Sequence, residues 1–119
     1  MANLILDKCL TAETQIPAYR IVKAGSTEGA AALATAATAA LIGVNEAIQA
    51  EIGEPVDVMK IGIADVQAGA TIAAGDPITA NATGQGIKGV TGNRIIGFAE
   101  SSAVSGDIFP VLLAPGFAA

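Results

Sequence analysis

Two short apolar runs, Leu41-Ile42-Gly43-Val44 and Ile95-Ile96-Gly97-Phe98, share an Ile-Gly pair on which the expected fold rests. Each run is followed by a glycine, an acidic residue and a further apolar run, at spacings that differ by one residue. These second runs are Gly53-Glu54-Pro55-Val56-Asp57-Val58 and Gly106-Asp107-Ile108-Phe109-Pro110-Val111. Recurrence of this kind is typical of repeated structural units. The sequence therefore predicts two related β half-units, in which residues 41–44 and 94–98 occupy equivalent positions.

Further runs rich in valine and isoleucine, bounded by Gly, Asp, Asn or Pro, predict β-strands along most of the chain. The candidates are residues 19–23, 41–44, 56–65, 77–80, 94–100 and 108–113. Many short strands at regular spacing favour a sandwich or a barrel. We therefore expect an all-β fold, a small β-sandwich or barrel. Because residues 108–113 are apolar on both faces, both faces of that strand are expected to be covered.

One domain is expected, because a chain of 119 residues has room for one core. Residues 1–17 are polar and apolar by turns and end at Pro17, so we expect an extended N-terminal arm over residues 1–17 and a single β domain over residues 18–119. Residues 29–41 suit either a helix or two short strands with a turn near Ala36, and the flanking glycine and the threonines favour strands. Residues 45–53 suit either a short helix or a long loop.

Charge and composition exclude several classes of function. The net charge of −5 leaves no basic patch for nucleic acid. The chain has no histidine, the commonest metal ligand and general base, and its single cysteine, Cys9, forms no internal disulfide. The longest apolar run, residues 29–44, is too short and too rich in alanine to span a membrane. We expect no catalytic site, metal or cofactor, and synthesis in the cytoplasm without a signal peptide.

One motif leaves an alternative function open. Val58-Met59-Lys60-Ile61 is similar to the Met-Lys-Met hairpin of biotinyl carrier domains, in which the lysine is modified. A carrier lysine needs an exposed turn, whereas residues 56–63 are predicted to form one uninterrupted strand. A biotinyl- or lipoyl-type carrier modified at Lys60 is therefore the alternative, and Lys60 is expected to be unmodified.

The pattern as a whole resembles the bacteriophage capsid decoration (cement) proteins, long catalogued as a domain of unknown function. The likeness spans residues 18–116 and rests on the order and spacing of many short pieces. In the first half these are residues 19–23, 33–38, 41–44, 53–56 and 62–64. In the second half they are residues 68–77, 94–99, 106–107 and 111–116.

The resemblance implies a structural protein of the virion, made in the host cytoplasm, that lies on the outer capsid surface. There it would stabilise the expanded head by bridging neighbouring copies of the major capsid protein, and it would have no active site. The resemblance also implies self-association, with a trimer favoured and a dimer or monomer left open. The expected capsid or oligomer contacts are Leu4, Leu6, Leu10, Phe109 and Phe117. A host-directed adhesin or sugar-binding module is a third class, which the 3% aromatic content disfavours because sugars stack on aromatic rings.

Overall fold

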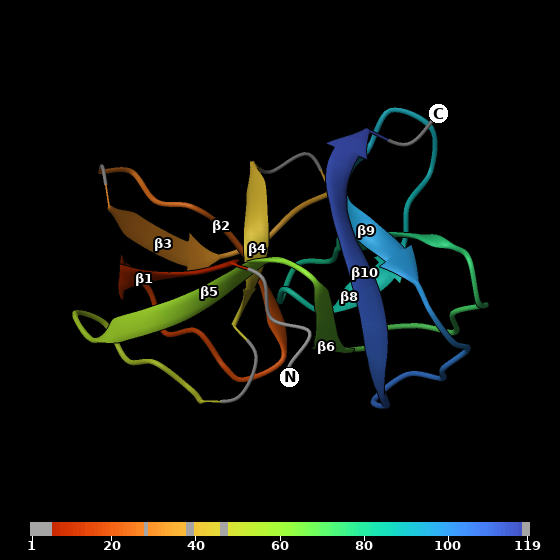
Figure 1. Cartoon of the computed structure of the whole chain (residues 1–119), viewed down its shortest axis with the longest axis horizontal. Coiled ribbons are helices and arrows are strands. Elements are labelled where there is room, and N and C mark those ends of the chain that lie inside the picture. The colour runs from red at the N-terminus through yellow and green to blue at the C-terminus, as the bar shows by residue number, and fades with distance from the viewer. Residues whose placement is uncertain (1–5, 28, 38–39, 46–47, 118–119) are drawn as a thin grey trace.

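The computed structural model describes residues 6–27, 29–37, 40–45 and 48–117, and their side chains except those of residues 6–9, 115 and 117. Within these residues every regular element is a β-strand (Figure 1), which confirms the all-β prediction. The first five strands are β1 (Leu6–Ala12), β2 (Arg20–Ala24), β3 (Ala30–Leu33), β4 (Leu41–Asn45) and β5 (Pro55–Ile61). The next five are β6 (Ile63–Gln67), β7 (Pro77–Ala80), β8 (Gly86–Lys88), β9 (Arg94–Ala99) and β10 (Ile108–Phe117).

The chain folds as two β units with the same strand order. The N-terminal unit, β1 to β5, is a barrel in the order β1-β3-β2-β4-β5, closed by pairing of β5 with β1. The C-terminal unit, β6 to β10, has the order β6-β10-β9-β7-β8. If β6 corresponds to β1 and the other strands follow in sequence, every strand pairing of the C-terminal sheet has a counterpart in the barrel. The predicted half-units are therefore confirmed, and residues 41–44 and 94–98 occupy equivalent strands, β4 and β9.

Finer details of the two units also correspond. The barrel is closed by a parallel pairing in which Ala12 lies opposite Ala31, and the C-terminal unit has a single parallel bridge between Ala68 and Gly86 at the matching place. Each unit also has one antiparallel bridge between its loops. These bridges join Ile16 to Ala50 and Ile72 to Ala103. The resemblance between the units therefore extends to single hydrogen-bonded positions.

The structure differs from the expectation of an arm over residues 1–17. From Leu6 onward this segment is β1, which pairs with β5 and β3, while residues 1–5 lie outside the described residues. Alternate residues of a strand share one face, and in β1 the alternate residues Leu10 and Ala12 are buried inside the barrel. The alternation that was interpreted as an arm is therefore the pattern of a half-buried strand.

Two other expectations are resolved by the backbone. The single strand predicted over residues 56–65 is divided at Gly62, whose φ of 120° favours glycine, so that β5 and β6 belong to different units. Of the open alternatives, residues 30–33 form strand β3. Asn45 ends β4, and residues 48–53 belong to the loop between β4 and β5 rather than to a helix.

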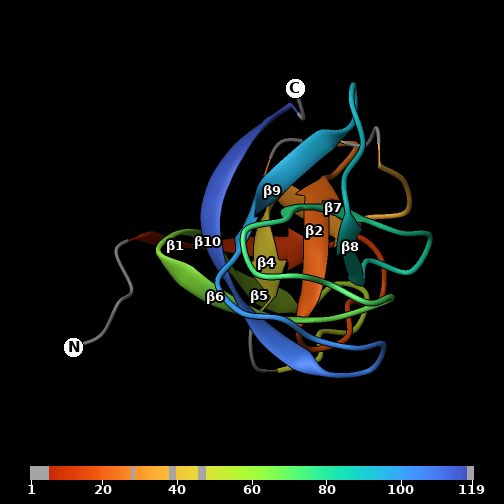
Figure 2. The same ribbon diagram turned by 90° about the vertical axis from the view of Figure 1, so that its right-hand side faces the viewer.

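Two apolar clusters form the core. One fills the barrel, and its members are Leu10, Ala12, Ile16, Val22, Ala31, Ala50, Val56 and Val58. The other fills the C-terminal unit and includes five residues of the N-terminal unit: Ile21, Ala34, Leu41, Val44 and Met59. Figure 2, seen from the side of the C-terminal unit, shows β2 and β4 behind β7 and β9. The two units are thus joined by a shared core.

Candidate functional site

The junction between the units is built by the start of β2. The amide of Ile21 donates to the carbonyl of Gly84 (2.8 Å), and the amide of Gln67 donates to the carbonyl of Tyr19 (2.9 Å). In the barrel the groups that correspond to the Gln67 amide and the Gly84 carbonyl bond to each other directly. They are the Thr11 amide and the Gly29 carbonyl (3.0 Å). The N-terminal unit therefore occupies an opening in the C-terminal unit that would otherwise close on itself.

Arg20 extends the same junction with its side chain. Its Nε and Nη2 atoms donate to Oε1 of Gln67 at 3.2 and 2.9 Å, and Nη1 donates to the carbonyl of Thr83 at 2.8 Å. Hydrogen bonds from a charged donor are stronger than neutral ones, and a guanidinium offers several donors in a fixed plane. These contacts fix how the two units sit against each other.

Two loops on the lower side of the molecule present large aliphatic side chains to solvent. In the β4–β5 loop Ile48 is 78% exposed and Ile52 is 73% exposed, and in the β9–β10 loop Val104 is 57% exposed. Both loops lie on the lower side of the molecule in Figures 1 and 2. We call Ile48, Ile52 and Val104 the apolar tips.

The tips are held by the same turn in both units. The amide of Glu51 donates to the carboxylate of Glu54 (2.8 Å), and the amide of Val104 donates to the carboxylate of Asp107 (3.2 Å). Carboxylates that accept local backbone amides stabilise such turns. Because both loops are pinned in this way, the tips lie on defined turns of the fold.

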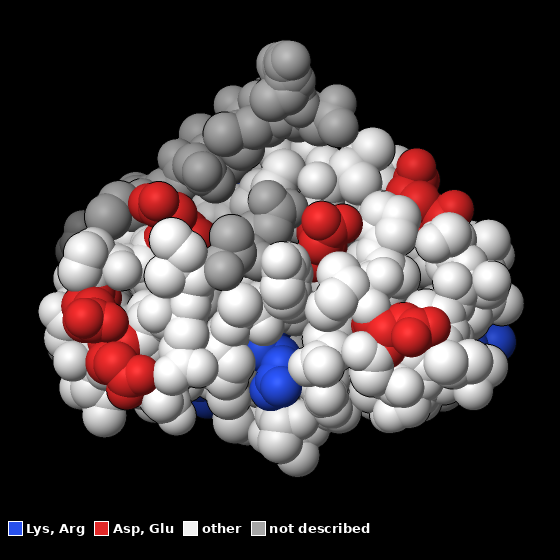
Figure 3. All heavy atoms as spheres, turned by 90° about the horizontal axis from the view of Figure 1, so that it is seen from below, with Lys and Arg blue, Asp and Glu red and all other residues white. Residues whose placement is uncertain are grey.

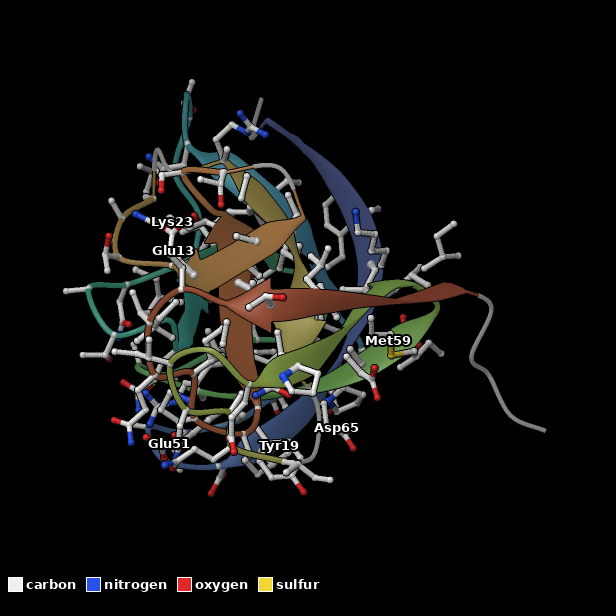
Figure 4. All side chains as sticks on the ribbon, turned by 90° about the vertical axis from the view of Figure 1, so that its left-hand side faces the viewer. Glu13, Tyr19, Lys23, Glu51, Met59 and Asp65 are labelled. Atoms are coloured by element: carbon white, nitrogen blue, oxygen red, sulfur yellow. The ribbon has the colours of Figure 1, made fainter. Side chains whose placement is uncertain are left out.

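The charged groups beside the tips include the carboxylates of Glu51, Glu54 and Asp107. Figure 3 shows this lower face with acidic side chains separated by uncharged surface. Glu51 accepts hydrogen bonds from Gln49 and Gln15, which lower the pKa of its carboxyl. At the other edge of the barrel, hydrogen bonds from Ser26 lower the pKa of Glu13, which lies beside Lys23 (Figure 4). Both carboxylates are therefore ionised at neutral pH.

A second apolar surface crosses the outer face of the C-terminal sheet. Leu112 and Phe98 lie opposite each other on β10 and β9, and they are 43% and 40% exposed. Ile63 on β6 and Pro77 on β7 continue the same row. We call these four residues the ridge. The expectation that both faces of residues 108–113 are covered is wrong, because Phe109, Val111 and Leu113 point inward while this outer face stays exposed.

A groove of about 400 Å³ opens on the barrel. It is lined by Leu10 of β1, Ile42 of β4, Lys60 of β5 and the turn that joins β2 to β3, beginning at Ala24. Lys60 is half-buried in a strand between β1 and β4 and does not lie at an exposed hairpin turn. This is not the setting that a carrier lysine needs.

The structure places the five predicted contact residues in different surroundings. Phe109 is 1% exposed in the core of the C-terminal unit, and Leu10 is 8% exposed in the barrel core, where it reaches the groove. Leu4 lies outside the described residues, and so do the side chains of Leu6 and Phe117. The apolar tips and the ridge were missed because apolar residue type does not reveal burial. The available signal was the apolar outer face of residues 108–113.

Within the part of the chain that the structure describes, no three His, Cys, Asp or Glu residues gather in a way that could hold a metal ion. The same residues contain no helix of the length and hydropathy that a membrane crossing requires.

Comparisons with known proteins agree with this architecture. A family model described as phage cement protein matches residues 2–113. No curated protein matches the chain. Among solved structures, the N base of the head fiber gp8.5 of bacteriophage phi29 is similar over 96% of this chain and 98% of that chain, with a TM-score of 0.70 and 18% identity. At that identity the similarity concerns the fold.

Proposed function

The chain belongs to the phage cement protein family, and on that premise we propose that it binds the outer surface of a phage head and stabilises the expanded shell by bridging neighbouring copies of the major capsid protein. Family membership gives the protein a structural role at the phage head. The finer assignment is that it is made in the host cytoplasm and joins the virion from outside. The solved head fiber base, also from a phage head, supports this context.

The observation that carries the bridging proposal is that each unit presents its own apolar tip. Ile48 and Ile52 belong to the N-terminal unit and Val104 belongs to the C-terminal unit, and both loops lie on one side of the molecule. Burying an aliphatic side chain of this size contributes about 1.5–3 kcal/mol. A ligand with two separate contact points can touch two neighbouring subunits, whereas a single patch anchors it to one.

Bracing follows from binding that depends on geometry. A ligand that binds only the assembled, expanded lattice adds its binding free energy to that state. Simultaneous contacts raise the effective affinity when the spacing fits, and they are lost when the spacing does not fit. The two tips therefore favour a shell whose subunits lie at the expanded spacing. Leu4, Leu6 and Phe117 remain further candidates for contact with the shell.

The test is sedimentation of the protein with undecorated shells of the same phage. We expect near-stoichiometric recovery with expanded shells and little with unexpanded precursors or free capsid subunits. Ile52→Asp and Val104→Asp should each reduce recovery, and the double variant should abolish it, because an ionised carboxylate at an apolar contact pays its desolvation cost.

Val90→Asp is the matched control, since Val90 is 64% exposed in the β8–β9 loop, which lies at the top of Figure 1, opposite the two loops that carry the tips. Failure of the folded wild-type protein to sediment with expanded shells would remove the assignment. Equal recovery of the double variant and the wild type would show that the tips are not the contact.

A further inference from the structure

The contact between the two units is a row of side chains seated in an opening. Ile21, Val44 and Met59 lie in register across β2, β4 and β5, and all three are buried. They belong to the cluster that fills the C-terminal unit, so the row of one unit packs into the interior of the other. The surface on which this row packs is therefore known: it is the interior of the C-terminal unit.

The C-terminal unit carries the same row, but it is exposed. Strand pairing places Pro77 opposite Phe98 and Phe98 opposite Leu112, in the register of Ile21, Val44 and Met59. These residues form most of the ridge. Val44 is fully buried, whereas its counterpart Phe98 is 40% exposed. The ridge is thus the counterpart of the surface that the N-terminal unit buries internally, and none of the residues that the structure describes covers it.

The opening shows the reverse relation. In the C-terminal unit the positions Ala80, Ile96 and Leu113 are buried, because the N-terminal unit covers them. The residues at the corresponding positions of the barrel are Ala24 on β2, Ile42 on β4 and Lys60 on β5. These three residues line the open groove of about 400 Å³. Within the described part of the chain, one row and one opening are therefore joined internally, and a second row and a second opening are left unpaired.

We propose that the ridge of one copy docks into the barrel groove of a second copy, repeating between molecules the contact that joins the two units within the chain. The contact is head-to-tail, because two different surfaces meet, and repetition of it gives a closed ring or an open chain. This inference does not rest on binding to a phage shell.

The contact between copies should be weaker than the internal one. Lys60 stands in the groove where the other opening has Leu113. This replacement exchanges apolar area for a charged group that must stay hydrated. Association should therefore depend on protein concentration.

The test measures molar mass against concentration by sedimentation equilibrium on the whole chain, without shells. We expect the wild-type mass to rise above that of a monomer. Leu112→Asp removes the ridge and Ala24→Arg obstructs the groove, and each should weaken association by roughly 30-fold or more. Both positions are exposed, so the fold should survive, as circular dichroism would verify.

Mixing the two variants gives the decisive result. Each retains the surface that the other lacks, so the mixture should form a one-to-one dimer and nothing larger. Val104→Asp is the control and should assemble as the wild type does, while its recovery with expanded shells is reduced. A wild-type protein that stays monomeric at every concentration, variants that assemble normally, or a mixture that forms no dimer would each overturn the proposal. Loss of shell binding by Leu112→Asp and Ala24→Arg, with a monomeric wild type, would assign both surfaces to the capsid protein instead.

Discussion

At the scale of single residues, the recurring Ile-Gly pair has a steric origin. A Cβ atom placed on Gly43 or Gly97 would collide with the backbone carbonyl of the neighbouring strand, at Met59 and Leu112 respectively. Neither glycine has a positive φ, so the requirement is space and not backbone conformation. The repeat in the sequence therefore records a close approach of β4 to β5 and of β9 to β10.

Alanine at Gly97 should destabilise the protein. The added methyl group must push β10 away from β9, and overpacking of this kind costs about 1–3 kcal/mol. Gly116 lies on β10 with nothing within 4 Å of an added Cβ, so Gly116→Ala should change stability by about 0.5 kcal/mol or less. Urea unfolding of the two variants makes the comparison. Equal unfolding midpoints would contradict the steric explanation.

Residue identity predicted some features of the molecule better than others. The glycines marked equivalent positions because each meets the same steric requirement, a close approach of the neighbouring strand. The expected contacts Leu10 and Phe109 are core residues instead, because the side an apolar residue faces depends on pairing with distant strands. The same limit hid Phe98, which has the residue type of a core position but lies on an open face.

At the scale of elements, β1 shows why a local pattern was insufficient. Its residues alternate as those of a strand do, but both of its partners, β3 and β5, are strands that do not follow it directly in the sequence. The strands at 41–44, 77–80, 94–100 and 108–113 were predicted because their runs of valine, isoleucine and leucine are bounded by turn residues. The division at Gly62 was missed because the apolar run continues through it.

Truncation should separate the strand from the residues before it. Removal of residues 2–5 leaves β1 whole, so the unfolding temperature should stay unchanged. Removal of residues 2–12 deletes a strand of the closed barrel and exposes the edges of β3 and β5, so cooperative unfolding should be lost. Thermal unfolding followed by circular dichroism measures both. If the protein with the longer deletion still unfolded cooperatively at the wild-type temperature, the prediction of an extended N-terminal arm would be correct instead.

At the scale of the whole molecule, duplication yields both of the proposed properties. Two copies of one β unit place apolar tips from both units on one side. Joining the units through one row and one opening leaves a second row and a second opening uncovered by the residues that the structure describes. The alanine-rich interior buries little area per residue, so association adds stability that a small core does not supply. A protein that braces a shell in this way would contact both its own copies and more than one shell subunit.

The most direct measurement is the melting temperature of expanded shells, followed by calorimetry with and without saturating protein. We predict that the wild-type protein raises the shell's melting temperature. The Ile52→Asp/Val104→Asp double variant should leave it unchanged, because the variant cannot hold two subunits together. A shell that is fully occupied by the wild-type protein, yet melts at the same temperature as the bare shell, would contradict the proposal that the protein stabilises the expanded shell.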